Sequence, residues 1–270
     1  MYKIVFVVII SLALSACKKK GCTDNRAINY DQAADTDNGS CIYDTVVPQP
    51  DTTNYRLQII PVFGNENFEL NQQYSTNIGD KVKIEDLKFY LSDINLIKAD
   101  NSEELVADVI LIDLRKSSSL IIERNITEGN YQSLKFNLGL TKELNNQDPS
   151  TFVKSHPLST FQNMYWTWST QYKFGVIEGR ADTTGNGAFN HTLLYHMGTD
   201  TLLRKVSLEN KNVVLSENDE VTTQKLEIDV NQVLFAGNDI IDIREDFYTQ
   251  TTDSFALSVR IQDNFSKAFE

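Results

Sequence analysis

The feature that most constrains the fold of this chain is a series of short segments in which apolar and polar residues alternate. Alternation with a period of two places the apolar side chains on one face of a β-strand. Turn-forming segments, such as residues 128–130 and 185–187, separate neighbouring strands. Many short strands joined by turns predict an all-β domain, an immunoglobulin-like antiparallel β-sandwich. The strands are expected at residues 55–62, 82–97, 105–114, 131–140, 164–177, 189–197, 226–235 and 255–261.

Within residues 82–97 the alternation changes phase. Apolar side chains occupy even positions before Glu85 and odd positions after Asp86. A shift of one residue moves every later side chain to the other face, so it predicts a bulge or bend here. The longest irregular connections are expected at residues 149–161 and 210–220, and long loops on a rigid sandwich often carry function.

The N-terminus has the pattern of a lipoprotein signal. Lys3 precedes an apolar run at residues 4–14, which is shorter than the roughly 20 residues that span a bilayer. The L-S-A-C sequence that ends at Cys17 resembles a lipobox, so we expect a signal peptide at residues 1–16 and a lipidated tether at residues 17–20. Double or triple acylation gives stable anchoring. The expected location is the cell envelope, on the outer membrane facing the periplasm or the cell surface.

Composition limits the partners. The chain carries 37 acidic against 25 basic residues, a net charge of −12, which argues against binding nucleic acid. No second stretch is long and apolar enough to cross a bilayer, so the lipid is the expected membrane contact. Residues 44–54 contain two prolines and are expected to be a linker. The main domain is then residues 55–270, and we expect a monomer.

Three cysteines are present, and Cys17 is assigned to the lipid. Cys22 and Cys41 remain as an even pair in an oxidising compartment, which predicts a disulfide. They lie in residues 21–43, which resemble a short disulfide module of exported bacterial proteins. A closed loop of this length stabilises the module by roughly 3 kcal/mol. Three polar side chains of the module either cap turns or offer oxygens to calcium: Asp35, Asp37 and Asn38.

The most unusual segment is residues 164–179, M-Y-W-T-W-S-T-Q-Y-K-F-G-V-I-E-G, which contains both tryptophans of the chain. On a strand, every second residue shares a face. From the residues alone, that face is a core face. Its members would be Met164, Trp166, Trp168, Thr170, Tyr172 and Phe174.

The string M-Y-W-T-W-x-x-x-Y-K-F-x-x-x-E-G resembles the hallmark of the MbnP-like family, which are exported copper-binding proteins. Other family motifs follow in the expected order across the whole main domain. They are L-K-F-Y-L-S-D-I-N-L at residues 87–96, G-N-Y at 129–131, F-N-L-G-L at 136–140, L-N-N-Q-D at 144–148, Y-H-M-G at 195–198 and N-F at 264–265.

The resemblance implies copper binding outside the cytoplasm by a protein that is not itself an enzyme. In some members a tryptophan is oxidised to kynurenine by a di-haem partner enzyme related to MauG and the bacterial peroxidases. Indole offers only an N–H donor, whereas kynurenine has an aniline nitrogen and a carbonyl. An imidazole beside it would complete a site suited to copper. The modified residue would be Trp166 or Trp168.

The candidate copper ligands are three histidines and one thioether: His196, His191, His156 and Met164. His196 lies in the Y-H-M-G motif and is the first candidate. His191 is five residues earlier, so on a regular strand it faces the opposite side unless a bulge intervenes. Met164 suits Cu(I) as a soft ligand, although packing is the commoner role of methionine. Gln171 departs from the family, which usually has glycine there.

Two other functions remain open. One is a surface binding module for a glycan or a protein, with an exposed tryptophan or tyrosine as its platform. The other is a structural envelope lipoprotein without metal. Enzyme motifs are missing: the sequence has no G-x-S-x-G, P-loop or H-E-x-x-H.

Overall fold

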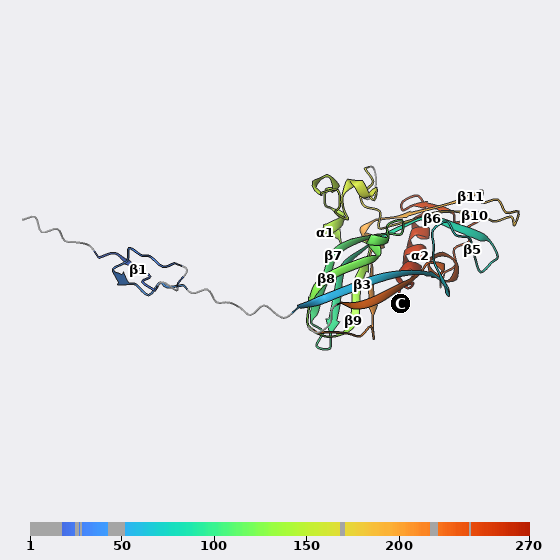
Figure 1. The fold of residues 1–270 in the computed structure, drawn as a ribbon. Helices are drawn as coiled ribbons and strands as arrows, with labels where there is room; N and C mark the ends of the chain where they lie inside the picture. Colours follow the sequence, from blue (N-terminus) through green and yellow to red (C-terminus); the bar gives the residue numbers. More distant parts are fainter. Residues whose placement is uncertain are drawn as a thin grey trace, which may run out of the picture. The chain divides into compact units, whose positions relative to one another are not determined.

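The computed structural model describes residues 18–24, 27, 29–42, 52–167, 171–216, 221–237 and 239–270. The predicted signal peptide (1–16), the lipidation site Cys17, most of the linker (44–54) and Trp168 lie outside these residues. The contacts of the chain divide it into two units, residues 1–49 and 50–270 (Figure 1). In the described part of the chain, no helix has the length and apolar character needed to cross a bilayer.

The N-terminal unit contains two short strands, β1 (Lys20–Gly21) and β2 (Thr36–Asp37), which pair in parallel. The predicted disulfide between Cys22 and Cys41 is present. A unit this small has little apolar core, so the disulfide is its main covalent constraint.

The polar side chains of this unit serve its turns. Asp37 and Asn38 each accept the backbone N–H two residues ahead, both at 3.0 Å. Asp35 accepts the backbone N–H of Lys19 at 3.3 Å. These contacts match the capping alternative rather than a calcium site.

The larger unit contains two sheets. The larger sheet has nine strands. Six of them are neighbours in the order β12, β9, β6, β10, β11 and β15, while β5 and β7 also pair with β6, and β13 pairs with β9. The smaller sheet has four strands, with β3 between β14 and β8 and with β4 at one end of β3. The strands of the larger sheet are β5 (Tyr74–Ser75), β6 (Lys81–Lys98), β7 (Glu103–Asp113), β9 (Gly129–Leu138), β10 (Gly175–Asp182), β11 (His191–Met197), β12 (Arg204–Leu208), β13 (Val213–Leu215) and β15 (Tyr248–Gln250). Those of the smaller sheet are β3 (Thr52–Phe63), β4 (Glu66–Asn67), β8 (Ile121–Thr127) and β14 (Thr222–Asp229).

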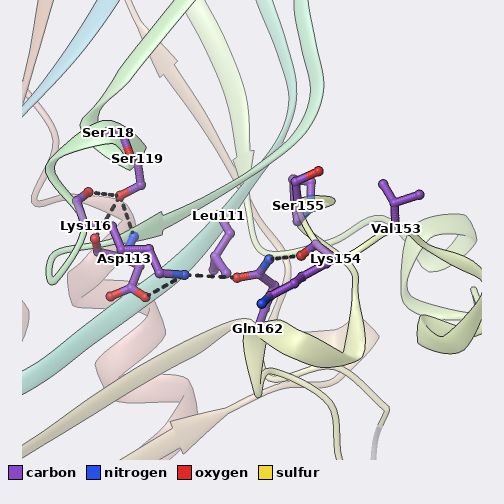
Figure 2. A pocket seen from close by; sticks show the side chains of 10 residues that line it. Leu111, Asp113, Lys116, Ser118, Ser119, Val153, Lys154, Ser155 and Gln162 are labelled. Carbon is purple, nitrogen blue, oxygen red and sulfur yellow. Dashed lines mark hydrogen bonds and ion pairs between the residues drawn. The ribbon is translucent and has the colours of Figure 1, made fainter.

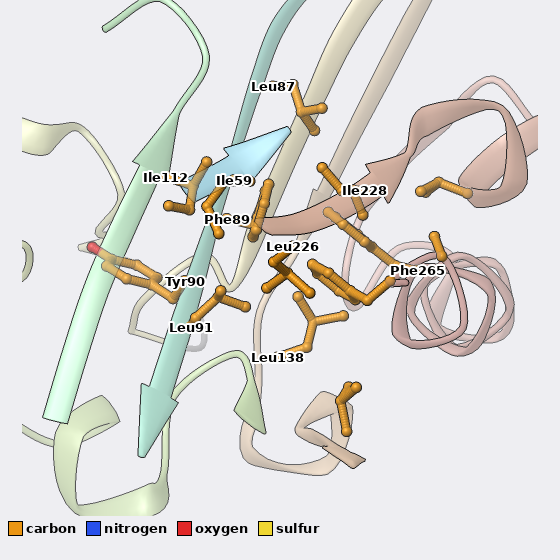
Figure 3. Close-up of a cluster of buried hydrophobic side chains, with 14 of the residues drawn as sticks. Ile59, Leu87, Phe89, Tyr90, Leu91, Ile112, Leu138, Leu226, Ile228 and Phe265 are labelled. Atoms are coloured by element: carbon orange, nitrogen blue, oxygen red, sulfur yellow. The ribbon is translucent and has the colours of Figure 1, made fainter. Parts of the chain in front are cut away.

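Apolar side chains from both sheets meet in one core. Figure 3 shows Ile59 of β3 and Leu226 of β14 beside Phe89 of β6 and Leu138 of β9. Phe265 adds its ring, with its centroid 5.0 Å from that of Phe89. The predicted all-β sandwich is confirmed, although β14 and β3, and β11 and β15, pair in parallel.

Helical segments are short and lie between the strands, except for α2 near the C-terminus. They are η1 (Ser117–Leu120), α1 (Lys142–Asn145), η2 (Pro149–Thr151), η3 (Thr160–Gln162), η4 (Asp200–Leu202), η5 (Gln232–Ala236) and α2 (Phe255–Ser266). The predicted strand at residues 255–261 is therefore wrong. Leu257, Ile261 and Phe265 recur every four residues and are buried, which is the spacing of a helix face.

Three other expectations need correction. The strand predicted at residues 226–235 ends at Asp229 and is followed by η5. The loop predicted at residues 210–220 contains β13. The strand predicted at residues 164–177 begins only at Gly175. In contrast, the predicted bulge is confirmed, because the β6–β10 register passes from Asp86 to Ile84 and skips Glu85.

Candidate functional site

The outer face of the larger sheet carries a row of polar residues. In register, Asp113 of β7 lies opposite Lys88 of β6, Lys88 opposite Val176 of β10, and Val176 opposite His196 of β11. Glu178 lies two residues from Val176 and shares this face. The alternate residues of β11, Leu193, Tyr195 and Met197, are fully buried in the core. Strand pairing alone therefore brings His196 to the polar face.

His196 is 9% exposed, and both its side chain and its backbone carbonyl make hydrogen bonds. Its Nε2 lies 2.7 Å from Oε1 of Glu178, and Thr251 donates its hydroxyl to the His196 carbonyl at 3.0 Å. Burial lowers the pKa of His196, although the Glu178 contact acts in the other direction. Its Nδ1 is buried and, among the described residues, has no hydrogen-bond partner. A buried imidazole nitrogen without a partner is a candidate for a ligand-binding atom.

Residues 163–167 and 171–174 lie over this face and are here called the tryptophan loop. The backbone N–H of Lys173 donates to the Met164 carbonyl, and that of Trp166 to the Gln171 carbonyl, both at 2.7 Å. Tyr165 and Tyr172 form an isolated antiparallel bridge. Residues 164–166 thus pair with residues 171–173, so the described part of this segment is not the continuous strand that the sequence predicts.

The tryptophan loop brings Trp166 beside His196. The two ring centroids are 6.3 Å apart, and Trp166 is only 3% exposed. Nζ of Lys173 lies 5.8 Å from the centroid of the Trp166 ring. The first candidate ligand and one of the two candidate tryptophans are therefore neighbours in space, whereas Trp168 lies outside the described residues.

His191 does not join this site. The register of β10 and β11 runs without a shift from Met197 to His191, so no bulge turns His191 toward the face of His196. Its Nε2 instead lies 2.6 Å from the carbonyl oxygen of Ile243, and its ring contacts Phe247.

His156 and Met164 also have other roles. His156 stacks on Phe152 with ring centroids 4.0 Å apart, and its Nδ1 accepts the Leu158 N–H at 3.1 Å. Met164 is 1% exposed and belongs to the hydrophobic core. Within the described ranges, no three side chains of His, Cys, Asp or Glu are grouped as a metal site.

The family model of MbnP matches residues 52–254, which include every described residue of this site. The chain belongs to the MbnP family. Among solved structures, the MbnP of Methylosinus trichosporium matches with 16% identity and a TM-score of 0.49, over 70% of this chain and 80% of that one. A comparison with curated protein sequences gives no match.

Two glycines of the MbnP motifs are needed for close approach. A Cβ at Gly179 would lie 2.3 Å from the Lys83 carbonyl oxygen, on the strand that carries the bulge. A Cβ at Gly198 would lie 2.2 Å from the carbonyl oxygen of Tyr172 in the tryptophan loop. At both positions the backbone packs so closely against its neighbour that no side chain fits.

The departure at Gln171 also has a structural meaning. Gln171 has φ +72°, in the left-handed region that favours glycine. A glycine at this position would adopt the same conformation without strain. The Gln171 side chain donates to Oδ1 of Asn146 at 3.0 Å, which ties the loop to the residue after α1.

A charged network that the sequence did not predict surrounds the site. Lys88 is buried between Asp86 at 3.6 Å and Asp113 at 4.0 Å, and Arg115 reaches Asp86 at 3.3 Å. Burial raises the pKa of Asp86. The alternation at residues 82–97 placed Lys88 on the polar face, but Asp113 and Arg115 come from β7 and the residues after it, and the pairing of β7 with β6 is not readable from the sequence.

A groove of about 670 Å³ opens at the far end of this row, between β7, η1 and residues 153–162 (Figure 2). Lys116 crosses it, with Nζ 3.2 Å from Gln162 and 3.5 Å from Asp113. No tryptophan or tyrosine occurs among the described residues that line it.

Proposed function

We propose that this MbnP protein binds copper outside the cytoplasm, at a site made by His196 and by Trp166 after its conversion to kynurenine. A di-haem partner enzyme related to MauG would perform the conversion, so the protein is a substrate of that enzyme and not a catalyst. One observation carries the proposal: Nδ1 of His196 is buried and has no hydrogen-bond partner among the described residues, and the centroid of its ring lies 6.3 Å from that of Trp166.

The donor set of the unmodified chain fits copper only in part. Nδ1 of His196 is available, but Nε2 faces Glu178 and the indole has no lone pair to donate. Opening the indole ring would add an aniline nitrogen and a carbonyl oxygen beside His196. Nitrogen donors of this kind suit copper. Kynurenine formation would therefore complete the site.

The conversion requires an external oxidant. Two molecules of hydrogen peroxide each give one oxygen atom and are each reduced to water. The indole C2–C3 bond is cleaved, and both of its carbons become carbonyl carbons in N-formylkynurenine. Hydrolysis then consumes one water and releases formate to leave kynurenine. Trp166 is almost fully buried, so the partner must reach it through the tryptophan loop or oxidise it from a distance.

Copper stoichiometry after co-expression with the di-haem partner tests the proposal. We expect stoichiometric copper in wild-type protein and loss of binding in His196→Ala and Trp166→Phe variants. His191→Ala is the matched control, since His191 lies on the opposite face of the same strand and should keep copper. Copper that binds equally in all four proteins would refute the site.

A binding module for a glycan or protein ranks second. The groove at Lys116 offers it a place. However, the aromatic platform expected of such a module is not found there, and Trp166 is too buried to serve as one.

A further inference from the structure

We infer that Glu178 is a positioning residue that holds neutral His196 as the Nε2–H tautomer, so that Nδ1 carries the free lone pair. The tautomer is a property of the protein before any metal binds. Only the later step, in which this lone pair binds copper, rests on the proposed function.

The backbone sets the distance between the two side chains. His196 pairs with Val176, and Glu178 follows Val176 by two residues on the same strand, so both side chains project from one face of adjacent strands. Nε2 of His196 and Oε1 of Glu178 are 2.7 Å apart, a short and charge-assisted contact.

The chemistry of the carboxylate selects the tautomer. An ionised carboxylate only accepts hydrogen bonds, so Nε2 must supply the hydrogen. The other tautomer would set the Nε2 lone pair against the Glu178 oxygen. It would also bury an N–H at Nδ1 that has no acceptor among the described residues. Both costs favour the Nε2–H form.

A carboxylate behind a histidine is a recurrent device of metal sites. It fixes the ring orientation and makes the opposite nitrogen a better donor, and its loss typically weakens metal binding 10–100-fold. In this chain Glu178 contacts Nε2 of His196, and Nδ1 has no hydrogen-bond partner in the part of the chain that the structure describes. The side chain of Glu178 is 42% exposed, so its removal should leave the fold intact.

Long-range ¹H–¹⁵N NMR of the metal-free protein at neutral pH tests the tautomer directly. In wild-type protein we expect a protonated Nε2 and a pyridine-like Nδ1 on His196. In Glu178→Ala the two tautomers should mix, while Glu85→Ala should match wild type, because Glu85 pairs with Arg180 at 3.2 Å instead. A protonated Nδ1 in wild type, or an unchanged tautomer in Glu178→Ala, would overturn the inference.

Copper affinity of the kynurenine form is the second readout. We expect Glu178→Ala to raise the copper dissociation constant roughly 10–100-fold, with Glu85→Ala unchanged. If wild-type protein has the expected tautomer but takes up no copper, the proposed function fails and the role of Glu178 stands. If copper binds while Nδ1 is protonated in the metal-free protein, the role of Glu178 fails and the function stands.

Discussion

At the scale of single residues, burial favours the neutral form of His196 and of His156. Burial lowers the pKa of both His196 and His156 below the ordinary value of about 6.5. A lowered pKa in the folded state means that the unfolded chain binds these protons more readily. The stability that each residue contributes is therefore full above about pH 6.5 and is lost as the pH falls toward its folded value.

We therefore expect the free energy of unfolding of the metal-free protein, measured with urea, to fall between about pH 7.5 and pH 5.5. His196→Asn should reduce this slope, because the side chain that resists protonation is gone. An equal slope in His196→Asn and wild type would show that burial of His196 does not oppose its protonation.

The conformation of Gln171 predicts a stabilising substitution. A left-handed backbone costs a non-glycine residue about 1–2 kcal/mol, whereas glycine loses about 0.5–1 kcal/mol of chain entropy on folding. Gln171→Gly should then raise the free energy of unfolding by about 0.5–1 kcal/mol. Asn163→Gly is the control, since Asn163 has φ +57° but asparagine tolerates this region. Destabilisation of Gln171→Gly would mean that its contact with Asn146 outweighs the strain.

At the scale of elements, the polar face depends on how closely β10 approaches β6 at the bulge. A Cβ at Gly179 would meet the rigid backbone of Lys83, whereas a Cβ at Gly175 would lie 3.0 Å from the flexible end of the Met197 side chain. Both glycines lie on β10.

A methyl group should therefore be tolerated at one glycine and not at the other. We expect Gly179→Ala to lower the free energy of unfolding by about 1–3 kcal/mol, the usual cost of overpacking. Gly175→Ala should cost less, because Met197 can change its rotamer. Chemical denaturation of the two variants provides the comparison, and equal losses would contradict the close approach at the bulge.

The sequence predicts strands and helices well where the apolar pattern continues over many residues. The phase change at Glu85 located the bulge because many alternating residues flank it. Residues 255–261 were too few to separate a strand from the helix of which they are a part. The tryptophan loop alternates like a strand, but the left-handed residues Asn163 and Gln171 turn the chain. Such turns depend on contacts made elsewhere in the fold.

At the scale of the whole molecule, family membership and fold were both predictable, since ordered motifs cover the main domain. His196 and Trp166 were predictable as members of motifs. Glu178 lies in the same motif, yet its contact with His196 depends on the pairing of β10 with β11. Sequence patterns assign residues to faces, but which strands become neighbours follows from the packing of the complete chain.

The lipobox predicts where the whole molecule resides. Cys17→Ser should move the protein from the membrane fraction to the soluble fraction, because the thiol that receives the lipid is lost. The double variant Cys22→Ser, Cys41→Ser removes the disulfide but should stay with the membrane. Fractionation followed by immunoblotting measures both. A Cys17→Ser protein that remains in the membrane fraction would rule out the lipid anchor.

The central claim is that His196 and a modified Trp166 form one copper site, and anomalous diffraction at the copper absorption edge tests it most directly. Crystals of copper-loaded protein, made together with its di-haem partner, should give one anomalous peak within bonding distance of Nδ1 of His196. The residue at position 166 should appear as kynurenine in contact with that peak. A peak at His191, at His156 or on any other side chain, or copper at His196 beside an intact indole, would contradict the account.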